Sequence, residues 1–234
     1  MQIHRAELTL LEPTFFASRE VSAFFQTEPL LGNYALAYAL GLCQSPYHRS
    51  GGPRYREDLE ALNREDVYVT PGTFRQETIR FTVTQFNALS DTYWYRFDQN
   101  ATTLDRREKA RPANFPQSGR IRMLGRGCRA VFYLLDNRDR DRRPPRYVRL
   151  GKFDSKARID WARPTWTIEE RDAVDVPFLL NPRDLPGGDT LRVFTLHAIH
   201  PTPLTSRTRL SGRFYRLADD TLLPDGMRFG LEGL

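Results

Sequence analysis

Residues 3–20 read IHRAELTLLEPTFFASRE, and this stretch is the strongest indication of the fold class in the chain. Ala6, Leu8 and Leu10 alternate with more polar residues, which is the period of a β-strand with one buried face. The strand is expected to end at residue 11, because an acid and a proline interrupt the alternation there. We therefore expect a protein whose first element is a half-buried strand.

Residues 27–42, TEPLLGNYALAYALGL, carry a helical pattern instead. Thr27 is a capping residue, and Pro29 stands in the first turn, where a helix tolerates a residue without a backbone N–H. We therefore expect a helix from Thr27 to about Leu42. One face carries apolar side chains at the spacing of a buried stripe, and we interpret its two tyrosines as core rather than as a platform for bases: Leu31, Tyr34, Ala35, Tyr38 and Leu42.

The rest of the chain indicates many strands and one further short helix. Period-two alternation and short apolar runs recur between turn residues. This set of elements predicts an α+β protein with a largely antiparallel sheet. A short helix is expected at 57–63, a half-buried strand at 79–84, and further strands at 93–97, 129–135, 147–150, 159–168, 191–199, 213–217 and 227–229.

The composition limits the class of protein. The chain has 234 residues, of which 40% are hydrophobic, enough to bury a core. No run approaches the about 18 apolar residues that span a bilayer, and the N-terminus lacks the features of a signal peptide, so we expect a cytoplasmic protein without membrane contact. Cys43 and Cys128 form no CxxC motif, and the four histidines lack zinc-ligand spacing. We therefore expect neither a metal nor a cofactor.

The formal net charge of +6 comes from 35 basic residues, and only Lys109, Lys152 and Lys156 among them are lysines. Arginine binds phosphate through two parallel hydrogen bonds, although a GC-rich genome also favours arginine codons. The position of the charge is more informative, because residues 101–163 carry a net charge of +11 and the remainder of the chain carries −5. A basic block on a mildly acidic chain predicts a segment that binds a nucleic-acid backbone.

Residues 119–127, GRIRMLGRG, lie inside this basic block. Glycines allow a backbone to approach a phosphate closely, and a strand would place Arg120 and Arg122 on one face. Arg126 adds a third charge. Two interpretations stay open, a phosphate-binding segment and a hairpin turn with solvated arginines.

The sequence carries none of the common catalytic motifs. The nucleophile elbow, the Walker A motif and the Rossmann glycine pattern are absent. His48, beside Tyr47, is a candidate general acid or base of an RNA-cleaving site, and His197 is a second. A surface histidine is the simpler interpretation, so we expect no catalytic residue and no enzyme.

The stretches LTLLEPTFFASRE (8–20), TEPL (27–30) and NYALAYAL (33–40) resemble a known family. They are similar to the type I-D CRISPR-associated subunit of the Cas-five type (Csc-one-like), which caps the 5′ handle of the guide RNA (crRNA) in the Cascade surveillance complex. The resemblance is specific over residues 8–42. Elsewhere it consists of the chain length, the basic block and the strand-rich C-terminal half.

The resemblance implies a RAMP fold: a ferredoxin-like, RRM-related and largely antiparallel sheet, an inserted basic arm or thumb, and a strand-rich C-terminal half. On this basis we assign 1–99 to the first part of the core, 100–127 to the arm, and 128–234 to the rest of the core with its C-terminal elaboration. The chain departs from the family pattern in two respects. The late glycine-rich loop is weak at 185–188, and the Tyr/Lys/His constellation of a guide-processing sister subunit is not recognisable.

The resemblance further implies a non-catalytic crRNA-binding subunit of a type I-D Cascade complex in antiviral defence. Such a subunit holds the crRNA 5′ handle and packs against the backbone and large subunits, with target DNA nearby. Two alternatives stay open: a metal-independent endoribonuclease that processes CRISPR repeat RNA, and an assembly protein whose basic block meets an acidic protein face. The candidate RNA-binding residues are Arg19, Tyr47, His48, Arg120, Arg122, Arg126, Arg129, Arg207 and Arg209.

Overall fold

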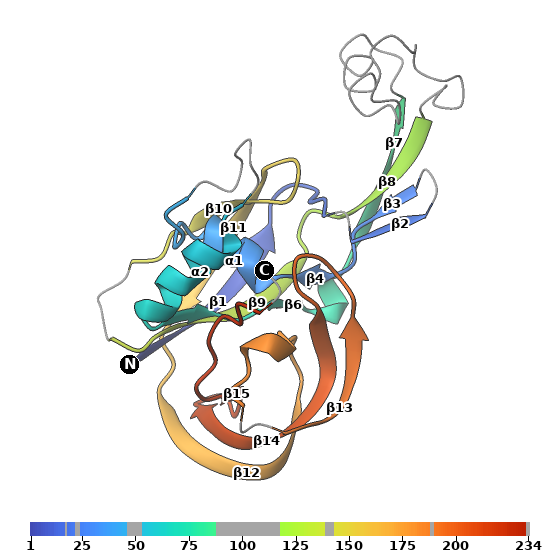
Figure 1. The fold of residues 1–234 in the computed structure, drawn as a ribbon. Coiled ribbons are helices and arrows are strands. Elements are labelled where there is room, and N and C mark those ends of the chain that lie inside the picture. The colour runs from blue at the N-terminus through green and yellow to red at the C-terminus, as the bar shows by residue number, and fades with distance from the viewer. Residues whose placement is uncertain are drawn as a thin grey trace.

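The chain forms three β-sheets and two α-helices in the part that the structure describes. All strand pairings there are antiparallel except one, between β3 and β8. Figure 1 shows a main sheet with the helices in front of it, a curled C-terminal sheet beneath, and a narrow sheet that projects to one side. The expectation of a largely antiparallel protein with a strand-rich C-terminal half is confirmed. The computed structural model describes residues 1–16, 18–21, 24–45, 53–87, 118–138, 143–187 and 190–232.

The first strand, β1 (Gln2–Leu10), lies at the centre of the main sheet. It is antiparallel to both of its neighbours, β9 (Arg129–Asp136) and β11 (Ser155–Ala162). The apolar side chains at positions 6, 8 and 10 are at most 1% exposed, which confirms the predicted strand and its buried face. The sheet is completed by β10 (Tyr147–Leu150) on one side and by β6 (Gly72–Phe74), β4 (Leu30–Leu31) and β5 (Val67–Val69) on the other.

Two helices, α1 (Asn33–Ala39) and α2 (Tyr55–Arg64), lie against one face of the main sheet (Figure 1). The second confirms the short helix expected at 57–63. The first begins later than predicted, because Leu30 and Leu31 pair with β6 and their backbone groups are used in the sheet. Tyr34 is 1% exposed and belongs to the core as predicted, whereas Tyr38 is only half-buried, so the prediction of a core role is confirmed for Tyr34 alone.

The C-terminal sheet curls around its own core (Figure 1). Its long central strand β14 (Leu204–Leu217) includes the strand expected at 213–217, and it pairs with β12 (Trp166–Val176), β13 (Thr190–His197) and β15 (Leu222–Pro224). The single strand expected at 159–168 is wrong, because β11 ends at residue 162 and β12 begins at 166, on either side of a proline.

The strand expected at 227–229 is also wrong. Met227 and Phe229 are buried, at 3% and 2% exposed, but they form no strand. The backbone carbonyl of Gly230 accepts a hydrogen bond of 2.9 Å from the Tyr34 hydroxyl. This last segment therefore closes the body by side-chain packing rather than by strand pairing.

A buried carboxylate, Asp184, joins the C-terminal part to the main sheet. It ends the short 3₁₀ turn Pro182–Asp184 and is 2% exposed. Its oxygens accept hydrogen bonds from Asn33 Nδ2 (2.6 Å), the Tyr68 hydroxyl (2.9 Å) and the Gly230 N–H (2.8 Å). Burial raises the pKa of Asp184 to about 7, because the loss of hydration outweighs these donors. One side chain thus fixes α1, β5 and the C-terminal segment relative to one another.

Neither helix in the described ranges is long and apolar enough to cross a bilayer.

Candidate nucleic-acid interface

Four strands form the narrow projecting sheet, which we call the arm sheet (Figure 1). Their order is β2 (Arg19–Val21), β3 (Phe24–Gln26), β8 (Ser118–Leu124) and β7 (Phe81–Asn87), and the 3₁₀ turn Gln76–Thr78 precedes β7. Residues 88–117, which include the strand expected at 93–97 and most of the segment assigned to the arm, lie outside the described residues. The assignment of 100–127 stays a prediction, and the structure adds β7 to the projecting part.

The register of the arm sheet places the two arginines of β8 on one face. Arg120 lies opposite Gln85 of β7 and Phe24 of β3, and Arg122 lies opposite Val83 and Gln26. Directly paired residues point to the same face of a sheet, and alternate residues of a strand do so too. We call this face the arm face; it consists of Arg19, Phe24, Gln26, Phe81, Val83, Gln85, Arg120 and Arg122.

The arm face exposes apolar side chains beside its cations. Phe81 is 42% exposed and Val83 is 56% exposed. The strand expected at 79–84 is present as β7, but the prediction that one of its faces is buried is wrong. The reason is that the arm sheet stands away from the core (Figure 1). The Arg122 guanidinium lies 4.5 Å from the centre of the Phe81 ring, in a cation–π contact. A planar cation beside an exposed ring can contact both phosphates and bases.

The three arginines of the arm face differ in their partners. The Arg120 side chain is exposed and makes no ion pair or hydrogen bond with the described residues. The Nε of Arg122 is buried and has no hydrogen-bond partner among them. Arg19 pairs with Glu28 at 3.1 Å. Two of the three guanidiniums therefore remain available for an anion.

The turn after β8 fixes the base of the arm sheet. Gly127 has a φ of +85°, a backbone conformation that favours glycine. The Gly125 N–H donates a hydrogen bond of 2.8 Å to the Arg80 carbonyl. Arg126, between the two glycines, is exposed and lies in this turn rather than in β8. Gly125 and Gly127 of the 119–127 motif therefore have a structural role at the turn, whereas Gly119 lies within β8.

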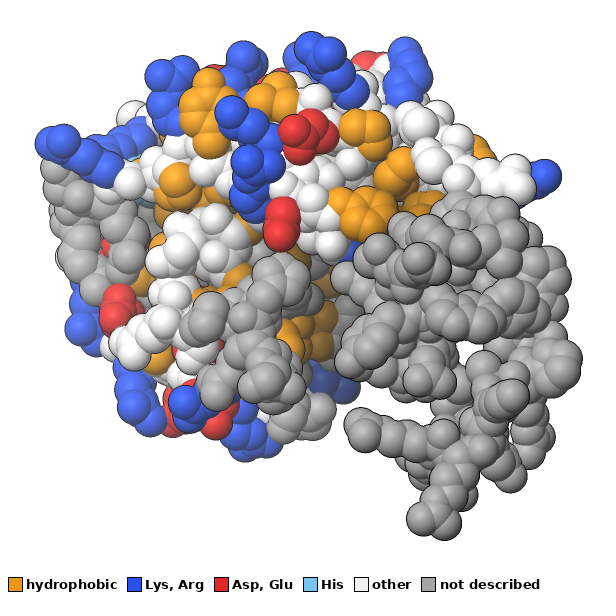
Figure 2. Space-filling model, turned by 90° about the horizontal axis from the view of Figure 1, so that it is seen from above, with side chains coloured by type: hydrophobic (Ala, Val, Ile, Leu, Met, Phe, Trp, Pro, Cys, Tyr) orange, Lys and Arg blue, Asp and Glu red, His pale blue; other side chains and the backbone are white. Residues whose placement is uncertain are grey.

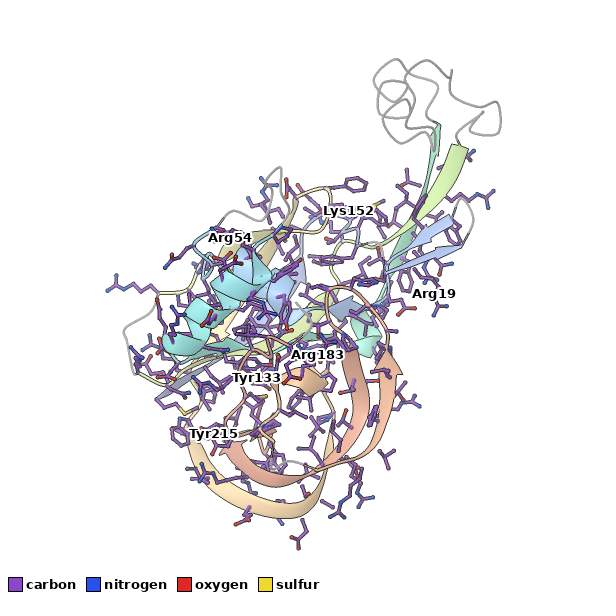
Figure 3. The ribbon with its side chains drawn as sticks, viewed as in Figure 1. Arg19, Arg54, Tyr133, Lys152, Arg183 and Tyr215 are labelled. Carbon is purple, nitrogen blue, oxygen red and sulfur yellow. The ribbon has the colours of Figure 1, made fainter. Side chains whose placement is uncertain are left out.

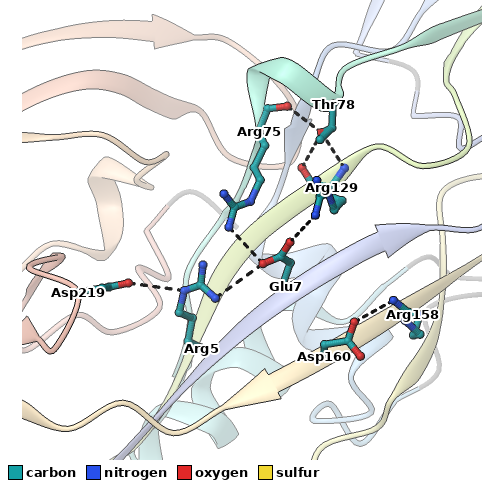
Figure 4. A network of polar contacts seen from close by, with 8 residues as sticks. All are labelled: Arg5, Glu7, Arg75, Thr78, Arg129, Arg158, Asp160 and Asp219. Carbon is teal, nitrogen blue, oxygen red and sulfur yellow. Dashed lines mark hydrogen bonds and ion pairs between the residues drawn. The ribbon is translucent and has the colours of Figure 1, made fainter.

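Arg129 belongs to a different group of charges, on the main sheet. Glu7 of β1 accepts hydrogen bonds from Arg75 (3.1 Å) and Arg129 (3.3 Å), and it lies 3.8 Å from Arg5 (Figure 4). Arg5 also lies 3.7 Å from Asp219, in the turn between β14 and β15. We call Glu7 and its three arginines the Glu7 cluster. Arg5 and Arg75 carried no signal in the sequence, because the members of the cluster come from separate segments.

The remaining candidates lie elsewhere. Arg207 and Arg209 are on β14 of the curled C-terminal sheet, which is separate from the arm sheet, and Arg209 lies 3.8 Å from Asp175. Tyr47 and His48 lie outside the described residues. Among the candidates that the structure describes, only Arg19, Arg120 and Arg122 lie together on the arm face.

His197, the second catalytic candidate, lies in β13. Its Nε2 is 2.8 Å from the Ser206 hydroxyl, and a hydroxyl is an ordinary partner for a histidine at the edge of a sheet. Among the described residues there is no group of three or more His, Cys, Asp or Glu side chains that could hold a metal ion.

The fold and this surface define a class: a largely antiparallel β protein with a projecting arm sheet whose exposed face combines arginines and an aromatic ring. The comparison with protein families is more specific. Residues 1–232 match the family model described as Type I-D CRISPR-associated protein Cas5/Csc1, so the chain belongs to this family. The match confirms the resemblance carried by residues 8–42 and extends it over almost the whole chain.

Among solved structures, one similar chain comes from a cryo-EM structure of the type III-B Cmr-β complex bound to cognate target RNA and AMPPnP. The similarity covers 88% of this chain and 86% of that chain, with 12% sequence identity and a TM-score of 0.43. This likeness is too distant to support a conclusion about function. No curated protein matches the chain.

Proposed function

We propose that this protein is a non-catalytic, crRNA-binding subunit of a type I-D CRISPR Cascade complex. In this proposal it holds the 5′ handle of the crRNA and packs against the backbone and large subunits, near the site where target DNA is recognised. The observation that carries the proposal is the arm face, in a chain that belongs to the Cas5/Csc1 family. Arg120 and Arg122 have no acidic partner among the described residues, and Arg122 lies against the exposed ring of Phe81.

The chemistry of the arm face suits a single strand of RNA. A guanidinium without a protein partner can bind a backbone phosphate and release its counterion. An exposed aromatic ring can stack on an unpaired base, which is the usual way in which proteins recognise single-stranded RNA.

The strand order of the main sheet supports the ferredoxin-like interpretation of the core. A βαββαβ chain forms a sheet in which the first strand lies between the third and the fourth, and the second lies at the edge beside the third. Here β1 lies between β9 and β11, and β5 and β6 lie beyond β9. Both helices belong to the connection between β1 and β5, and the connection from β9 to β11 contains no helix among its described residues.

The binding part of the proposal is tested by fluorescence anisotropy of the purified chain with single-stranded RNA of the handle sequence. We expect binding that weakens steeply as KCl rises from about 50 to about 300 mM, because bound phosphates release counterions. RNA binding that is absent, or that is insensitive to salt, contradicts the proposal. If a partner subunit still co-purifies in that case, the protein acts in assembly alone.

The non-catalytic part is tested by incubating the chain with CRISPR repeat RNA in EDTA. We expect the RNA to remain intact. A discrete cut that disappears in the His48→Ala variant shows instead a metal-independent endoribonuclease.

A further inference from the structure

A pocket of about 960 Å³ lies between α1, the β10–β11 turn and the loop 199–202. This volume is at the upper end of the range for pockets that hold one small molecule or one nucleotide. Small residues border the space on this side: Gly32, directly before α1, and Ala35 and Ala39 on α1. Figure 3 shows Lys152, at the rim of the pocket, on the side of the body that faces the arm sheet and Arg19.

The wall formed by the β10–β11 turn is held rigidly. Gly151 has a φ of +73°, and a Cβ on it would lie 2.5 Å from the carbonyl oxygen of Phe15, so only glycine fits. The Lys152 N–H donates to that carbonyl (2.9 Å), and the Ser155 hydroxyl donates to the Pro13 carbonyl (2.7 Å). This wall of the pocket is therefore preformed, which lowers the entropic cost of ordering it on binding.

Two lysine ammonium groups at the rim are available for an anion. Lys152 and Lys156 both line the pocket, and neither forms an ion pair with the described residues. The Lys156 ammonium lies 4.9 Å from the centre of the Tyr147 ring, which is 53% exposed. Arg149, by contrast, is 3.8 Å from Glu12. On the face seen from above in Figure 2, basic side chains are more numerous than acidic ones and hydrophobic side chains lie between them.

The interior of the pocket is aromatic. Phe16, Tyr34 and Tyr38 line it. Tyr34 is only 1% exposed, so the aromatic surface comes mainly from Phe16, Tyr38 and the neighbouring Tyr55. The Tyr38 hydroxyl donates to Asp58 (2.8 Å), so this polar atom is already used. Apolar walls below a rim with two lysines and one carboxylate, Asp154, match the two parts of a nucleotide, its base and its phosphate.

The pocket borders the start of the arm sheet. Ser18 lines the pocket, and the next residue, Arg19, begins β2 of the arm sheet. The Ser18 hydroxyl accepts a hydrogen bond of 3.2 Å from the N–H of Glu28, which also pairs with Arg19. The pocket and the arm sheet are therefore neighbours through residues 18 and 19.

We propose that this pocket holds one unstacked nucleotide of the RNA bound on the arm face. Its base lies against the aromatic side chains beside α1, and its phosphate lies at Lys152 and Lys156. The inference rests on the proposed RNA-binding function, and it adds a separate subsite for a single nucleotide.

The test places 2-aminopurine at each position in turn of a single-stranded RNA that the full-length chain binds. We expect the fluorescence of one position to change upon binding, because its base leaves the stack. Ala35→Phe fills the pocket without changing a charge, so it should abolish that change. Ala218→Phe, at an exposed turn on the C-terminal sheet, is the matched control and should retain it.

A charge variant tests the rim independently. Lys152→Gln should weaken RNA binding by about threefold, through the loss of one phosphate contact. The matched control Arg192→Gln removes an exposed cation without an ion-pair partner among the described residues, on β13, and should change affinity by less than about twofold.

The outcomes separate this proposal from the proposed function. If the chain binds RNA but no position responds to Ala35→Phe, the pocket proposal is overturned and the RNA-binding function stands. If Ala35→Phe leaves the RNA signal intact and abolishes co-purification of a partner subunit, the pocket takes a protein segment and the proposal is again overturned. If the chain binds no RNA, the proposed function fails first. Circular dichroism and thermal melting establish that each variant is folded.

Discussion

The arm face and the Glu7 cluster both contain arginines, but these arginines have different partners. On the arm face, Arg120 has no partner among the described residues, and Arg122 contacts the ring of Phe81. In the Glu7 cluster all three arginines lie within 3.8 Å of one carboxylate (Figure 4). The Glu7 side chain is 22% exposed, so water screens its contacts only in part.

The difference teaches that the number of arginines at a surface does not identify a binding site. The Glu7 cluster joins β1, β9 and the loop before β7, and through Arg5 it extends to the turn between β14 and β15. A connected, partly buried network of this kind stabilises the fold. An arginine without a protein partner adds little to stability, and its full hydrogen-bonding capacity remains for a ligand.

The largest effect is expected when the two available arginines of the arm face are removed together. Arg120→Gln/Arg122→Gln should weaken RNA binding by about thirtyfold or more, because two phosphate contacts and one stacked cation are lost. The slope of log K against log salt should fall by about 1.4. Fluorescence anisotropy over a salt series measures both quantities.

The matched control takes two arginines from the Glu7 cluster. Arg75→Gln/Arg129→Gln removes the same charge but should change RNA affinity by less than about threefold, while lowering the melting temperature. Equal losses of affinity in the two double variants would show that general charge, rather than the arm face, binds the RNA.

The next effect is on stability. Glu7→Gln leaves the three guanidiniums of the cluster without their carboxylate, so we expect the free energy of unfolding to fall by about 1–2 kcal/mol with little change in RNA affinity. Urea denaturation followed by circular dichroism measures it. Glu77→Gln, which removes an exposed carboxylate, is the control and should cost less than about 0.5 kcal/mol. A Glu7→Gln variant as stable as the control would show that the cluster is only a solvated surface.

The period of two in the sequence predicted correctly the strands in which the position of each side chain follows from strand geometry alone. The alternation from Ala6 to Leu10 predicted both β1 and its buried face, because a strand at the centre of a sheet has one face on the core. The same period in GRIR placed Arg120 and Arg122 on one side of β8. Here the backbone geometry of a strand is sufficient, and no long-range contact is needed.

The predictions from the sequence were wrong or incomplete where contacts between residues far apart in the chain decide the structure. The pairing of Leu30 and Leu31 with β6 removes the first turn of the expected helix, although capping residues are present before it. Alternation at 79–84 shows which residues of β7 share a face, but not that the arm sheet stands away from the core. The Glu7 cluster was invisible because positions 5, 7, 75 and 129 meet only after folding.

The smallest effect sharpens the comparison within the arm face itself. Arg19 lies on this face but is paired with Glu28, so at present it resembles the arginines of the Glu7 cluster more than it resembles Arg120. Glu28→Gln should release the guanidinium for a phosphate. We expect RNA affinity to rise by about twofold and the salt slope to steepen by about 0.7.

The control for this change is Glu57→Gln, which releases Arg54 (3.3 Å) from an exposed pair at the start of α2. It changes the net charge equally, far from the arm sheet, and should leave RNA binding nearly unchanged. If Glu28→Gln instead weakens binding, Glu28 positions Arg19 for the RNA rather than competing with it. In that case an ion-paired arginine contributes to RNA binding as well as to stability. The arginines of the arm face and of the Glu7 cluster would then differ in where their carboxylate partners hold the guanidinium groups.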